Sequence, residues 1–91
     1  MYNIEFTNKM KRDVKRVEKR GKNMTKLSDV LKIIVGGNQL PIRYKDHQLT
    51  GNMKNYRECH IESDWLLIYK IDSNKLIFYA TGTGTHSELF G

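Results

Sequence analysis

The spacing of the apolar residues changes along this 91-residue chain. In the stretches Met10–Val17 and Leu27–Ile34 they recur at intervals of three and four, the period of an amphipathic helix. From Tyr56 onwards they alternate with polar residues or run without a break, as they do in strands. The chain is therefore expected to be an α+β protein whose helices precede most of its sheet.

Turn and cap residues divide these stretches into elements. We expect a first strand over 2–6, a helix that begins after Thr7 or Asn8 and ends at Gly21, and a second helix from Thr25 to the glycines at 36 and 37. Strands are predicted over 56–61, 65–71 and 75–80, joined by three-residue hairpin turns. Residues 40–55 are expected to be a loop, residues 81–86 a flexible tail, and residues 87–90 one helical turn. The predicted fold is a single domain over 1–91: a strand, a basic helical hairpin, and an antiparallel meander with the helices on one sheet face.

Several protein classes are excluded by what the chain lacks. Its single cysteine, Cys59, forms no disulfide within the chain and no multi-cysteine zinc site. No apolar run approaches the roughly 20 residues of a membrane-spanning helix, and the first ten residues lack the apolar core of a signal peptide. We therefore expect a cytoplasmic protein with no membrane partner.

The positive charge is concentrated on one segment. The chain carries a net charge of +6, yet residues 9–26 hold nine basic and two acidic residues, so this segment alone carries +7. Such a segment attracts polyanions, either nucleic acid or an acidic protein. The alternative is a solvated helix face that keeps the protein soluble.

Three histidines, His47, His60 and His86, lie among polar residues. An imidazole that titrates near pH 7 can serve as a general acid or base, although each of them alone is also an ordinary surface residue. No HExxH motif, no cysteine pair and no close histidine spacing predicts zinc. We therefore expect neither a metal nor a cofactor.

Three other features have simpler interpretations. The run Thr81–Thr85 lacks the lysine of a phosphate-binding loop. Cys59 precedes His60 directly, and neighbours on a strand point to opposite faces, so the two are not expected to form a nucleophilic pair. Trp65 either belongs to the core or presents a stacking surface for a nucleic-acid base.

The C-terminal half resembles a known family. Asp46-His47 with Leu49 and Gly51, then Cys59-His60 followed by Asp64-Trp65, and finally Gly84-Thr85-His86 with Leu89-Phe90 resemble the YafQ family, and the likeness runs nearly end to end. This family comprises toxins of type II toxin–antitoxin modules in the RelE/ParE superfamily. The resemblance implies a RelE-like fold and a small ribosome-dependent mRNA endoribonuclease, or mRNA interferase.

Specific residues and partners follow from this resemblance. It implies catalysis by an acid/base cluster of His47, His60, Asp64 and His86, without metal, through attack of the RNA 2′-hydroxyl. It also implies a DinJ-like ribbon–helix–helix antitoxin, and binding to operator DNA only through that antitoxin. The ribosome and mRNA are the expected targets, and the residues expected to contact RNA are Trp65, Phe90, Lys11, Arg12, Lys15, Arg16 and Arg57.

One position departs from the family pattern. Four residues before the last histidine the family has an arginine, whereas this chain has Gly82. An arginine there would donate hydrogen bonds to the scissile phosphate. The absence of this arginine favours an alternative function: the chain would be a catalytically weakened homologue that acts mainly through antitoxin binding and operator autoregulation. Glycine is otherwise explained by a backbone φ above zero. A gyrase-inhibiting ParE-like toxin is a third possibility, but it would not require the histidines.

Overall fold

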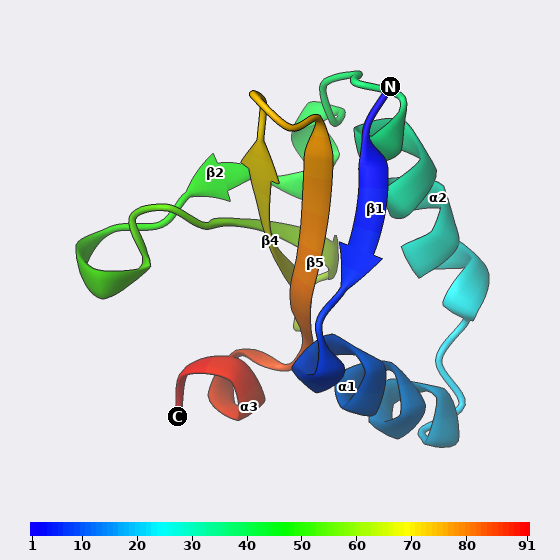
Figure 1. The fold of residues 1–91 in the computed structure, drawn as a ribbon. Coiled ribbons are helices and arrows are strands. Elements are labelled where there is room, and N and C mark those ends of the chain that lie inside the picture. Colours follow the sequence, from blue (N-terminus) through cyan, green and yellow to red (C-terminus); the bar gives the residue numbers. More distant parts are fainter.

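A five-stranded sheet of order β1-β5-β4-β3-β2 forms the centre of the protein in the computed structural model, which describes residues 1–91 (Figure 1). The central strands β3, β4 and β5 form the expected antiparallel meander, and β1 runs parallel to β5 at one edge. None of the three α-helices has the length and apolar character that a membrane crossing requires. In chain order the elements are β1 (Asn3–Phe6), α1 (Asn8–Lys19), α2 (Met24–Val35), the short 3-10 helix η1 (Ile42–Tyr44), β2 (His47–Gln48), η2 (Gly51–Met53), β3 (Arg57–Glu62), β4 (Trp65–Asp72), β5 (Ile77–Gly84) and α3 (His86–Phe90).

Both long helices begin at a side-chain cap. The Thr7 hydroxyl accepts the Met10 N–H at 3.1 Å, and the Asn23 amide oxygen accepts the Thr25 N–H at 3.1 Å, so α2 begins one residue earlier than predicted. Gly21 follows the end of α1 with a φ of +79°, a conformation that favours glycine. The helices do not lie side by side as a tight hairpin: α1 packs on β5 and β1, whereas α2 packs on β3.

The third strand of the meander corrects the prediction for the C-terminal segment. β5 runs from Ile77 to Gly84, so the threonine–glycine run is not a flexible tail but a buried part of the sheet paired with β4. Gly82 lies opposite Ile68 and has no positive φ, so backbone conformation does not explain this glycine. The loop at 40–55 also contains a short strand, β2, which pairs with the start of β3.

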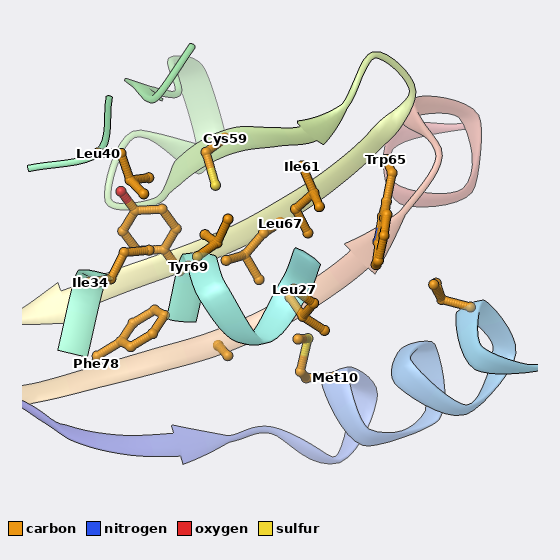
Figure 2. Packing of buried hydrophobic residues seen from close by; sticks show 13 residues of the cluster. Met10, Leu27, Ile34, Leu40, Cys59, Ile61, Trp65, Leu67, Tyr69 and Phe78 are labelled. Carbon is orange, nitrogen blue, oxygen red and sulfur yellow. The ribbon is translucent and has the colours of Figure 1, made fainter. Parts of the chain in front are cut away.

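The core lies between the sheet and the two long helices. Met10 of α1 and Leu27 of α2 pack toward Leu67 and Phe78 on the sheet face that the helices cover (Figure 2). Trp65 also belongs to this core, because only 2% of its surface is exposed (Figure 2). The prediction that Trp65 contacts RNA is therefore wrong: its ring is enclosed by the core and cannot stack on a base.

Two buried polar residues join α1 to the end of β5. The Asp13 carboxylate accepts the Thr83 N–H at 3.1 Å, and the Thr83 hydroxyl accepts the indole N–H of Trp65 at 2.9 Å. The same hydroxyl donates to the Leu66 carbonyl at 2.7 Å. Because buried polar groups need partners, these contacts fix α1, β4 and β5 relative to one another.

We expect Thr83→Val to lower the free energy of unfolding by about 1–3 kcal/mol, because valine leaves the indole N–H of Trp65 buried without an acceptor. Urea denaturation followed by the fluorescence of Trp65 measures the change. The control is Thr25→Val, which removes an exposed hydroxyl on α2. Equal stability of the two variants would contradict the role given to the Thr83 hydroxyl.

Candidate active site

The candidate site lies on the sheet face opposite the two long helices. On β3 the side chains of Cys59 and Ile61 enter the core, so those of Glu58 and His60 point to the other face. β2 places His47 beside Glu58 in the register of the sheet. Alternation along one strand and pairing with the next therefore bring together residues that are up to 13 positions apart.

Glu58 links the two sheet histidines. One of its carboxylate oxygens lies 3.5 Å from the Nε2 atom of His47 and 3.5 Å from the Nε2 atom of His60. The Nδ1 atoms face the Lys45 and Ser63 carbonyls at 2.7 and 3.2 Å, so each Nδ1 carries the proton. When either ring takes up a second proton, the new N–H faces a carboxylate that is itself 91% buried on its side chain.

His86 approaches this pair from α3. It is the first residue of that helix, and its ring lies 5.0 Å from the ring of Phe90 one turn later. His47, Glu58, His86 and Phe90 line one hollow of about 360 Å³. The structure thus places His47 and His86 in one groove, with the ring of His60 beside it, 6.5 Å from the ring of His47. Phe90, which is 38% exposed, is available to contact a base.

Asp64 contacts α3 and makes no hydrogen bond to His60. Its carboxylate accepts the backbone N–H of His86 at 2.9 Å, whereas His60 is held by Ser63 and Glu58. Asp64 therefore holds the start of α3, and with it the histidine that this helix carries.

Glu88 fixes α3 from its other side. With Thr85 it forms a capping box, in which each side chain bonds the other residue's backbone N–H. Its carboxylate also pairs with Arg16 at 3.0 Å and with both terminal nitrogens of Arg20. The hydrogen bonds from Arg20 hold the pKa of Glu88 well below its usual range.

The basic segment is divided between internal ion pairs and a free face. Arg16 lies 3.1 Å from Asp13 and 3.0 Å from Glu88, so it joins α1 to α3, while 39% of its side chain stays exposed. Lys11, Arg12 and Lys15 are exposed and make no ion pair, as expected for residues that meet a polyanion.

Arg57 lies away from the histidines. It shares a sheet face with Cys59, and its guanidinium pairs with Asp46 at 2.9 Å, which raises its pKa. Together with Tyr69 it lines a hollow on the helix-covered side of the sheet. Alternation along β3 turns Arg57 to the face opposite the histidines, so contact of Arg57 with RNA stays a prediction for a surface other than the groove.

Thiol chemistry is excluded at this site. Cys59 is fully buried, and burial raises the pKa of its thiol to about 12. At neutral pH almost none of it is the reactive thiolate. No group of three or more histidine, cysteine or acidic side chains is arranged to hold a metal ion.

Comparison with known proteins identifies the family. The family model described as the bacterial toxin of type II toxin–antitoxin systems, YafQ, matches residues 2–91. The chain belongs to the YafQ family. The mRNA interferase toxin YafQ of Escherichia coli K12 is 44% identical over 89 residues, which are 97% of this chain and 95% of that protein.

Solved structures of similar proteins show the same fold. The crystal structure of YafQ from E. coli strain BL21(DE3) has a TM-score of 0.92 at 38% identity, over 100% of both chains. The toxin in the E. coli DinJ-YafQ complex has a TM-score of 0.91 at 39% identity, also over 100% of both chains. A metal-bound toxin from Helicobacter pylori has a TM-score of 0.93 at 37% identity, over 99% of this chain and 100% of that one. The RelE-like α+β fold expected from the sequence is confirmed.

Two residues that line or support the site were missed from the sequence. Glu58 stands two positions before His60, and the period of a strand places both on one face, so the signal was present. Lys9 lines a second hollow next to the first, together with Gly82 and Phe90. No sequence pattern singles Lys9 out, because it is one of nine basic residues in its segment.

We expect Asp64→Ala to speed hydrogen exchange at the His86 amide, because alanine removes the acceptor of that N–H. Asp64→Asn keeps an oxygen in the same place and should preserve most of the protection. Amide exchange followed by NMR measures both variants, with the Leu67 amide in the central strand as internal reference. Equal protection of His86 in Asp64→Ala and in the unchanged protein would contradict the positioning role.

Proposed function

We propose that the protein is a ribosome-dependent mRNA endoribonuclease that cleaves by general acid–base catalysis. The observation that carries this proposal is the groove lined by His47, Glu58 and His86, with His60 beside it facing the same Glu58 carboxylate oxygen as His47. The E. coli relative, named an mRNA interferase, supports the same reaction class. The chemistry needs a base for the 2′-hydroxyl, an acid for the leaving oxygen and a donor to the phosphate.

The two walls of the groove suit different steps. On the sheet wall, a histidine takes the proton of the 2′-hydroxyl, and Glu58 stabilises the imidazolium that forms. The 2′-oxygen then attacks phosphorus, and the bond to the 5′-oxygen breaks, leaving a 2′,3′-cyclic phosphate and a 5′-hydroxyl. On the α3 wall, His86 contacts the phosphate and supplies the proton to the leaving oxygen. Phe90 stacks on a base beside the cleaved bond.

The ribosome and the mRNA bind to two different surfaces of the protein. Lys11, Arg12 and Lys15 lie on the exposed face of α1, away from the groove, and bind ribosomal RNA while the groove takes mRNA. A ribbon–helix–helix antitoxin of the DinJ kind neutralises the toxin, as the E. coli complex suggests, and operator DNA is bound only through it. The site of action is the cytoplasm, where translating ribosomes are found.

A weakened toxin is the second candidate, and Gly82 favours it. Glycine offers the phosphate no side-chain donor. If cleavage on ribosomes is absent while antitoxin binding remains tight, the chain acts through the antitoxin and operator alone.

We expect His86→Ala and His60→Ala each to lower cleavage of mRNA on programmed ribosomes by about 10²–10⁴-fold, the usual contribution of a general acid or base. Ser87→Ala, which changes the neighbouring exposed residue of α3, is the matched control. Cleavage is followed by primer extension, with antitoxin binding as the check on folding. Full activity of both histidine variants would exclude the proposed mechanism.

We expect reversal of Lys11, Arg12 and Lys15 to glutamate to abolish ribosome binding, because these side chains are free of ion pairs. Arg16 is left unchanged, since its loss would disturb Asp13 and Glu88. Cosedimentation with ribosomes measures binding, and thermal unfolding checks the fold. Unchanged cosedimentation would show that this face is only a solvated surface.

A further inference from the structure

A second hollow continues the histidine groove toward α1. It measures about 200 Å³, and Met53 and Phe90 line both hollows. Its remaining wall includes Tyr56, Leu89 and Gly82. A strand of RNA that lies in the groove can therefore extend into this space.

Lys9 is the sole lysine or arginine that lines either hollow. Its ammonium nitrogen lies 3.2 Å from the point where a β-carbon on Gly82 would be, and Leu89 and Asp13 lie 3.3 and 3.4 Å from the same point, so a side chain at position 82 would push these neighbours aside. No side chain at position 82 stands between the amine and the hollow. The two hollows together thus have one lysine in their lining, Lys9, and its amine is not covered by a side chain at position 82.

Asp13 holds this amine in place from behind. The Nζ of Lys9 lies 2.6 Å from the Asp13 carboxylate, whose side chain is 95% buried and also accepts Thr83 N–H and pairs with Arg16. Glu88 and Arg20 complete the network. It contains three cations and two carboxylates, so one positive charge is left over, and the half-exposed Lys9 is the member that faces the hollow.

We propose that Lys9 donates to a phosphate of RNA bound in the second hollow, next to the histidine groove, where Gly82 has no side chain to cover the amine. This inference rests on the proposed endoribonuclease function and names the cation that this function needs. A hydrogen-bond donor held before substrate arrives stabilises the charge that develops on the phosphate. An arginine at position 82 would occupy the same space, so the two cations are alternatives.

A set of four variants tests the proposal. They are Lys9→Met, Gly82→Arg, the double variant that combines both, and Lys32→Met, which removes an exposed helical lysine far from the hollow in sequence and without an ion pair. We expect Lys9→Met to lower cleavage on programmed ribosomes by about 10²-fold, the loss typical of one such donor. Lys32→Met should change it little, and Gly82→Arg should restore most of the activity lost in Lys9→Met.

Binding of a short 2′-O-methyl RNA, which cannot be cleaved, separates this inference from the proposed function. Weaker binding by Lys9→Met than by Lys32→Met supports the phosphate contact, even if the unchanged protein proves inactive on ribosomes and the endoribonuclease function fails. Equal binding and equal cleavage by Lys9→Met and Lys32→Met would overturn the role of Lys9. Thermal unfolding and antitoxin binding check that Lys9→Met is folded. We expect it to be, because Asp13 keeps its contacts with Arg16 and Thr83.

Discussion

The buried carboxylate of Asp13 is the contact on which the rest of the structure depends. It lies on a helix, yet it accepts the N–H of Thr83 near the end of the last strand, 70 residues later. Thr83 in turn holds the indole of Trp65, so one acidic side chain determines where α1, β4 and β5 meet. A buried carboxylate is stable only when it is paired and hydrogen-bonded, and here Lys9 and Arg16 provide the pairs. The direction in which β5 leaves the core, and hence the position of α3, follows from this contact.

The five-residue helix α3 is too short to be stable alone, because the entropy lost in forming its first turn exceeds the stabilisation from the few hydrogen bonds of a single turn. It is held at three points: the capping box of Thr85 and Glu88, the bond from the His86 N–H to Asp64, and the ion pairs of Glu88 with Arg16 and Arg20. These contacts come from the β3–β4 turn and from α1. An exposed histidine therefore acquires a fixed position through its backbone, while its ring stays free to meet a substrate.

Local signals in the sequence were enough for the elements that depend on neighbours. Short stretches of sequence predict the cap at Thr7, the glycine stop at residue 21 and the hairpin turns, and the structure contains all of them. The errors concern residues whose partners are distant. The sequence of Thr81–Gly84 predicts a flexible tail, because no neighbouring residue in the sequence indicates that β4 and α1 enclose this segment. The sequence also does not show that Arg57 pairs with Asp46, because the two residues are 11 positions apart and belong to different elements.

The number of basic residues in the segment 9–26 does not show how many of them are available to bind a polyanion. Of its nine lysines and arginines, five pair with carboxylates: Lys9, Arg16, Arg20, Lys22 and Lys26. The pairs of Arg16 and Arg20 with Glu88 join α1 to α3, and the pairs of Lys22 and Lys26 join the residues after α1 to Glu62 at the end of β3. The four that remain, Lys11, Arg12, Lys15 and Lys19, are exposed and recur at helical spacing along α1.

A duplex RNA bound to these four residues loses about one counterion for each cation that meets a phosphate, so the salt dependence of binding reflects at most four contacts on this face. Lys9, although its amine is paired with Asp13, lines the second hollow next to the histidine groove, so the role proposed for it is in the site and not on this outer face.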